Sequence, residues 1–195
     1  MFNDLSTPLS ILQTRRSGKP RAMVAPGPDD AQLRAILSVG MRTPDHGKLA
    51  PWRFIIVPQD RRDAFETVLA EATARAAPES VSGEKVRIDI AANREFAQQA
   101  PTLIVVLSKP VREAKIPVWE QELSAGAACM NIGHAAHALG FVAGWLTGWP
   151  SYDSHVRDAF GGPDEKIAGF IFIGTAGAVL EERPRPAYDD IVSVW

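Results

Sequence analysis

The chain is predicted to fold as an α+β domain with a central mixed or antiparallel sheet flanked by helices. Helical and strand patterns are mixed along its 195 residues without a strict βαβ alternation. Hydrophobic residues make up 46% and charged residues 23%, which is typical of a globular protein with a real core. No internal repeat or second hydrophobic unit is visible, so we expect a single domain over residues 1–195.

Helix and strand signals follow one another through the first half of the chain. A first helix is predicted over Pro8 to Arg16, with Leu9 and Leu12 facing inward. Asp29 or Asp30 can cap a second, amphipathic helix. The next predicted elements are a mostly buried strand over 52–57, a helix over 60–76, a loop over 78–83, a helix over 84–99 and a central strand over 101–108.

The longest helix is predicted over Val118 to Leu139, with Gly140 as the glycine that ends it. This helix is rich in small residues, so we expect it at the centre of the fold or across a subunit interface. The tail from Glu181 to Trp195 ends in apolar residues and is expected to pack on its own domain or on a partner subunit. The other predicted elements are strands over 141–147 and 167–174 and a short helix over 153–160.

Charge and cysteine content narrow the function classes. The net charge is −2 and the pI is about 6.1, whereas nucleic-acid-binding domains are usually more basic, so no nucleic-acid partner is expected. The single cysteine, Cys129, excludes an intrachain disulfide framework and is interpreted as a packed core thiol. No signal pattern and no apolar run of roughly 18 residues is found, so the expected location is the cytoplasm, away from membranes.

Two arginine-bearing segments carry the candidate site. The first is Arg15-Arg16-Ser17, and the second runs from Arg42 to His46. Guanidinium groups bind phosphate oxygens bidentately and a serine hydroxyl adds a donor, so these segments suit a phosphate joined to a flat, electron-accepting ring. His46 could act as a ligand-facing donor near such a ring. The alternatives are cations at helix ends in solvent and a histidine in a surface turn.

Other kinds of site find little support. No Gly-x-Gly-x-x-Gly follows a predicted strand, and neither a Walker-type loop nor a Gly-x-Ser-x-Gly elbow is present. His134 and His137 lack a third ligand at a recognisable spacing, so no metal is expected. Glu120 and Glu122 cannot share a helix face and make a poor acid/base pair. We therefore assign no catalytic proton-transfer residue.

These motifs together resemble the nitroreductase superfamily, most closely its compact bacterial branch of YdjA type. The resemblance runs from about residue 9 to the tail. It implies a nitroreductase-like fold, a homodimer with interlocked subunits, and one FMN in each of two clefts at the interface. The motifs that carry it are Arg15-Arg16-Ser17, Arg42-Thr-Pro-Asp-His46-Gly-Lys-Leu-Ala-Pro-Trp52, Trp119-Glu-Gln-Glu-Leu-Ser-Ala-Gly126 and Gly140-Phe-Val-Ala-Gly144-Trp145.

The resemblance also implies site residues. Arg15, Arg16 and Ser17 would hold the phosphate and ribityl end of FMN, and Arg42 and His46 belong to the other main FMN-contacting segment. The stretch Leu146, Thr147 and Gly148 would pass the isoalloxazine, with Leu146 where some relatives carry arginine. Arg183 and Arg185 resemble paired basic residues on the FMN phosphate. The segment linked with NAD(P)H comprises Ala136, His137, Ala138, Leu139, Gly140 and Phe141.

The implied activity is that of an FMN-dependent NAD(P)H oxidoreductase. It would reduce nitroaromatic, quinone-like or related flat acceptors by ping-pong hydride transfer through flavin N5. The two arginine-bearing segments are expected to reach one flavin from different subunits. Two other hypotheses stay open at this point: a non-catalytic flavin-binding store or sensor, and an assembly module built on the small-residue helix and the apolar tail.

Overall fold

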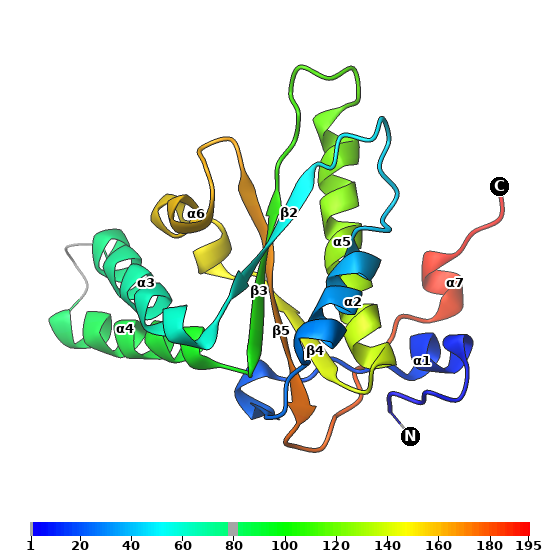
Figure 1. Cartoon of the computed structure of the whole chain (residues 1–195), viewed down its shortest axis with the longest axis horizontal. Helices are drawn as coiled ribbons and strands as arrows, with labels where there is room; N and C mark the ends of the chain where they lie inside the picture. Colours follow the sequence, from blue (N-terminus) through cyan, green and yellow to red (C-terminus); the bar gives the residue numbers. More distant parts are fainter. Residues whose placement is uncertain (1, 78–81) are drawn as a thin grey trace.

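An antiparallel sheet forms the centre of the molecule (Figure 1) in the computed structural model, which describes residues 2–77 and 82–195. The long strand β5 pairs with β1, β3 and β4, and β3 pairs with β2 on its other side. Every pairing is antiparallel, which confirms the antiparallel form of the predicted sheet. The strands are β1 (Met23–Val24), β2 (Trp52–Val57), β3 (Thr102–Ser108), β4 (Val142–Leu146) and β5 (Lys166–Ala176).

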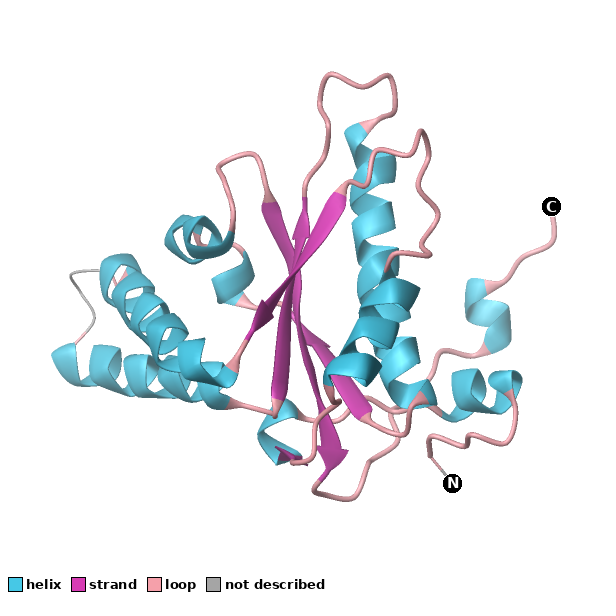
Figure 2. Ribbon diagram, in the orientation of Figure 1, coloured by secondary structure: helices cyan, strands magenta, loops and turns pink. Residues whose placement is uncertain are grey.

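Helices cover both faces of the sheet, as Figure 2 shows. One face carries α3 (Arg62–Ala76), α4 (Gly83–Gln98) and α6 (Ser154–Phe160), and the other carries α2 (Asp30–Gly40) and α5 (Val118–Ala138). The short helices α1 (Pro8–Thr14) and α7 (Tyr188–Ile191) lie farther out, on the α5 side. The described residues also include 3-10 turns at Pro20–Ala22, Gln59–Arg61 and Trp149–Ser151.

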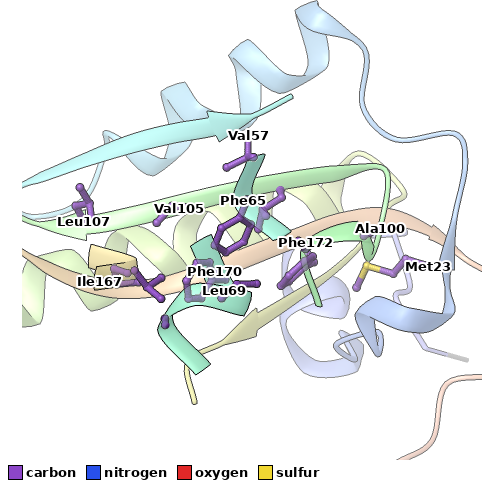
Figure 3. Close-up of a cluster of buried hydrophobic side chains, with 14 of the residues drawn as sticks. Met23, Val57, Phe65, Leu69, Ala100, Val105, Leu107, Ile167, Phe170 and Phe172 are labelled. Carbon is purple, nitrogen blue, oxygen red and sulfur yellow. The ribbon is translucent and has the colours of Figure 1, made fainter. Parts of the chain in front are cut away.

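Each face of the sheet has its own hydrophobic core. On the α3 side, Phe65 and Leu69 pack against Phe170 and Phe172 of β5 (Figure 3). The rings of Phe65 and Phe170 stack with their centroids 5.7 Å apart. On the α5 side, a second cluster includes Ile36, Cys129, Ile132 and Ile171. The central strand β3 is buried on both faces, as its continuous apolar run predicts.

Most predicted elements are confirmed, including α5 and its end at Gly140, which has φ of +86°. Helix α4 begins one residue earlier than predicted, at Gly83. Residues 78–81 of the predicted loop lie outside the described part of the chain. The two-residue strand β1 and the one-turn helix α7 were not predicted, since elements this short show no periodicity.

Two expectations about burial were wrong for the single chain. Strand β2 is only partly buried because it forms an edge of the sheet. Helix α1 ends at Thr14, and Leu9 and Leu12 are exposed because α1 lies outside α5 rather than against a core. The apolar end of the tail does not pack on its own domain, and Trp195 is exposed, which leaves packing on a partner subunit as the prediction for this segment.

A buried arginine of α3 links strand β2 and helix α4 through hydrogen bonds. Arg62 is fully buried, and its Nε donates to the Val57 carbonyl at 3.0 Å while Nη1 donates to the Ala97 carbonyl at 2.7 Å. Burial lowers its pKa to about 10, so the guanidinium stays charged at neutral pH. Arg62 therefore fixes the end of α4, from which Phe96 lines the cleft described below. No helix among the described residues has the length and apolar character to cross a membrane.

Candidate functional site

The first arginine-bearing segment lies along strand β4. Arg15 already has extended backbone angles, so the chain leaves α1 before this segment begins. The Gly18 N–H donates to the Ala143 carbonyl at 3.3 Å. A Cβ on Gly144 would lie 2.9 Å from the Gly18 carbonyl oxygen, so a glycine is required for this approach. Close backbone contact with β4 thus positions the segment.

Arg16 anchors this segment to the C-terminal tail. Its side chain is buried, and Nε donates to the Glu181 carbonyl at 2.8 Å. The same nitrogen forms an ion pair with Glu182 Oε1 at 3.4 Å. The Arg16 guanidinium therefore already has protein partners, and its clearest role in the chain is to hold the tail beside the segment.

Arg15, in contrast, forms no ion pair with any described residue. Its Nη1 donates to Ser17 Oγ at 3.3 Å. Burial lowers its pKa below the ordinary value, and the positive charges of Arg185 and then Arg16 lower it further. Arg185 has a carboxylate partner in Glu182, at 3.2 Å. The arrangement leaves Arg15 as a partly buried cation between like charges, which is the environment an anionic ligand would stabilise.

A cleft of about 840 Å³ opens beside this cluster. The structure brings four predicted cofactor residues to its walls: Arg16, Ser17, Leu146 and Arg183. Thr147 and Gly148 follow directly after β4 and are exposed. Basic side chains from the first segment and from the tail thus share one cleft with the end of β4.

The end of α5 and the residues after it form the segment linked by resemblance with NAD(P)H. The side chains of Ala136, His137 and Phe141 are buried, whereas the three residues 138–140 are exposed and available to a ligand. Burial lowers the pKa of His137 to about 4, and Arg15 adds to the effect, so this imidazole is neutral at pH 7. Burial and then Arg15 also lower the pKa of His134. The C-terminal end of α5 therefore lies close to Arg15.

Neither histidine takes part in a metal-binding group. Across residues 2–77 and 82–195, no three His, Cys, Asp or Glu side chains gather as ligands. Burial raises the pKa of the Cys129 thiol to about 12, as expected for the packed core thiol that the sequence indicates.

The second arginine-bearing segment is a tight loop that follows α2. Asp45 organises it by accepting hydrogen bonds from the backbone N–H groups of Leu49 at 3.0 Å and Ala50 at 2.8 Å. Gly47, Lys48 and Ala50 all have positive φ. Such backbone is costly for residues with a Cβ, so surrounding contacts must hold it. The Arg42 and His46 side chains are exposed.

Three polar side chains of α5 supply those contacts. Glu120 Oε2 lies 2.8 Å from His46 Nδ1, and Ser124 Oγ donates to the Pro44 carbonyl at 2.7 Å. Asn131 Nδ2 donates to Thr43 Oγ1 at 2.9 Å. Sequence analysis missed these three residues as parts of the site. Their spacing of four and seven residues on a small-residue helix is the signal that could have identified them.

Arg15 and His46 are not brought together within one chain. Arg15 lies near His134 of α5, whereas the second segment contacts the same helix at Asn131 through Thr43 and at Glu120 through His46. Fourteen residues separate His134 from Glu120, so the helix contacts of Arg15 and His46 lie about 21 Å apart at a rise of about 1.5 Å per residue. Figure 1 shows α1 and the loop before β2 toward opposite ends of α5. Within one chain, Arg15 and His46 therefore lie at separate positions along α5.

The chemistry of the two arginine-bearing segments fits FMN. The first combines an uncompensated cation, a hydroxyl and a cleft, which suits a phosphate with a polar chain attached. The second presents an arginine and an imidazole on a fixed loop, which suits the polar edge of a ring.

Comparison with known proteins places the chain in a family. The model of the nitroreductase family matches residues 12–175. The chain is 38% identical over 168 residues to "Putative NAD(P)H nitroreductase YdjA" from Escherichia coli (strain K12), covering 86% of this chain and 87% of that protein. It is 36% identical to "Putative NAD(P)H nitroreductase" from Haemophilus influenzae (strain ATCC 51907 / DSM 11121 / KW20 / Rd), covering 91% and 92%.

Solved structures share the fold. A crystal structure of a nitroreductase with bound FMN from Bacteroides fragilis NCTC 9343 superposes with a TM-score of 0.71 at 22% identity, covering 97% of this chain and 99% of that one.

Proposed function

The chain belongs to the nitroreductase family, and on that premise we propose that it is an FMN-dependent NAD(P)H oxidoreductase reducing nitroaromatic, quinone-like or related flat acceptors. The observation that carries the proposal is Arg15, a partly buried cation between two other arginines without an ion-pair partner among the described residues. A cleft of about 840 Å³ is lined by the adjoining residues Arg16 and Ser17. A phosphate at this position would supply the missing negative charge.

The residues of this chain would bind and orient the cofactor. Arg15, Ser17 and Arg185 would hold the phosphate, with Arg183 at the cleft wall and Arg16 keeping the tail in place. The stretch 146–148 would lie beside the ring. FMN, when bound, supplies the redox chemistry by accepting a hydride from NAD(P)H and passing it to the acceptor in a ping-pong cycle. We propose that NAD(P)H approaches along the exposed residues 138–140.

A second copy of the chain would complete each site. The helix contacts of Arg15 and His46 lie about 21 Å apart along α5, so His46 would come from the partner subunit, together with Arg42 of the same loop. The α5 side also carries many exposed apolar side chains, as an interface requires. They are Leu9 and Leu12 on α1, Val39 and Met41 at the end of α2, Trp119 and Leu123 on α5, and Tyr188, Ile191, Val194 and Trp195 in the tail. We therefore propose an interlocked homodimer of single FMN-binding domains spanning residues 1–195, working in the cytoplasm.

Three measurements on the purified full-length protein test this function. The protein should be yellow or should bind added FMN, which quenching of flavin fluorescence measures. Light scattering should give the mass of a dimer. Steady NAD(P)H oxidation should follow addition of a nitroaromatic or a quinone. Failure to bind FMN would overturn the proposal, and FMN binding without turnover would favour the store or sensor.

A further inference from the structure

We propose that Glu120 is a positioning residue that fixes His46 in its Nδ1–H tautomer, so that the free Nε2 of the neutral ring accepts a hydrogen bond from the ligand. The inference rests on the proposed function for its ligand, and on the contact between Glu120 Oε2 and His46 Nδ1 for its geometry. That contact measures 2.8 Å.

The tautomer follows from the chemistry of the pair. An ionised carboxylate can only accept hydrogen bonds, so the proton in this contact belongs to His46 Nδ1. A neutral imidazole carries one N–H, which leaves a lone pair on Nε2. The sequence suggested that His46 could act as a donor toward the ligand. The contact with Glu120 instead gives the neutral ring an acceptor, which would pair with an N–H or O–H of the ligand.

Two further contacts make this orientation specific. Ser124 donates a hydrogen bond to the Pro44 carbonyl, and Asn131 donates one to the Thr43 hydroxyl. Helix α5 therefore fixes the loop on the N-terminal side of His46. Asp45 fixes the loop on the other side by accepting from two backbone N–H groups. With the backbone held on both sides, the Glu120 contact determines how the imidazole turns about its own side-chain bonds. This is how a neighbouring carboxylate commonly orients a functional histidine.

The chain contains a matched control for Glu120. Glu122 lies two residues along the same helix and makes an ion pair of similar length with Lys166, at 2.7 Å. It makes no hydrogen bond or ion pair with the second segment. Replacing Glu122 therefore removes a comparable surface ion pair and leaves the environment of His46 intact.

The first test is a long-range ¹H–¹⁵N spectrum of the histidine-labelled full chain without FMN at pH 8. The His46 signals are assigned by their loss in His46→Gln. We expect the Nδ1–H tautomer in the wild type, in Glu122→Ala, and in Glu120→Gln, whose amide oxygen still accepts. Glu120→Ala should shift His46 toward the Nε2–H tautomer. A wild-type Nε2–H tautomer, or a Glu120→Ala spectrum like that of the wild type, would overturn the proposal.

The second test is FMN affinity by fluorescence quenching. Glu120→Ala should raise the Kd by about threefold to tenfold, as expected for one lost hydrogen bond. The Kd of Glu120→Gln should return to the wild-type value, and the Kd of Glu122→Ala should stay within about twofold of it. An unchanged Kd in Glu120→Ala would show that His46 Nε2 makes no hydrogen bond with the ligand. If the wild type binds no FMN, the proposed function fails, whereas the spectrum still decides the tautomer.

Discussion

The two arginine-bearing segments are held in different ways. Arg16 anchors the first segment through a buried side chain that reaches the tail, and Arg15 beside it has no ion-pair partner among the described residues. The second segment is an exposed loop held by hydrogen bonds from α5 and by a backbone turn around Asp45. Changes in charge should therefore affect the first segment most, and changes in backbone geometry the second.

Acid should produce the largest effect, through the buried histidine beside the first segment. The folded-state pKa of His137 is about 4, against an ordinary value of 6.5. Between these values the unfolded chain binds a proton that the folded chain does not, so stability falls as the pH falls from 6.5 toward 4. We expect a loss of about 3 kcal/mol in the free energy of unfolding, at about 1.4 kcal/mol per pH unit. Urea unfolding of the apoprotein at several pH values measures it.

Two variants test whether this pH dependence of stability comes from His137. His137→Gln should remove most of the slope of stability between pH 4.5 and 6.5 and leave the smaller contribution of His134, whose pKa is also lowered by burial and then by Arg15. His155→Gln should retain it, because this more exposed histidine pairs with Glu71 at 2.9 Å, away from the first segment. The paired carboxylate Glu165, whose pKa is lowered first by its hydrogen bond with Arg53, loses its contribution below this window. A slope unchanged in His137→Gln would contradict the assignment.

Neighbouring arginines of the first segment should separate binding from stability. Arg15→Ala should raise the Kd for FMN about tenfold to a hundredfold, because a charge-assisted contact is worth about 1.5–3 kcal/mol. It should leave the urea midpoint of the apoprotein unchanged or slightly higher, since like-charge repulsion is removed. Arg16→Ala should instead lower that midpoint, because the Glu181 carbonyl loses its donor. If Arg15→Ala destabilises the apoprotein more than Arg16→Ala does, the contrast between the two is wrong.

Features set by local sequence signals could be predicted, whereas features set by tertiary contacts could not. The apolar run of β3 and the glycine after α5 are local signals, and both elements formed as predicted. The exposure of Leu9 was missed because periodicity shows which side of a helix is apolar, but not whether the same chain covers that side.

Within the candidate site, motif spacing predicted both segments but not the residues that hold them in place. The link between Arg16 and Glu181 joins residues far apart in sequence, and so does the contact between His46 and Glu120. Positive φ at Lys48 contradicts the local preference of lysine. Such features depend on tertiary contacts, which a single sequence does not specify.

The smallest effect should come from backbone geometry in the second segment. Gly47 has φ of +81°, and an added Cβ would lie 3.2 Å from Ile116 Cγ1. Gly47→Ala should lower the free energy of unfolding by about 1–2 kcal/mol, the cost of a Cβ in left-handed backbone. The strain acts on the loop that presents Arg42 and His46, so FMN affinity should fall as well, while the pH dependence due to His137 stays unchanged.

A matched glycine separates this strain from the effect of an extra methyl group. Gly83 begins α4, and an added Cβ there would meet no atom within 4 Å. Gly83→Ala should therefore leave FMN affinity as it is in the wild type, and the urea midpoint should stay unchanged or rise slightly because alanine is the better helix former. Equal losses in the two variants would show that the loop tolerates the Cβ at Gly47. The anchoring of the second segment would then depend on the side chains of α5 alone, and replacing Glu120 or Ser124 would become the more informative perturbation.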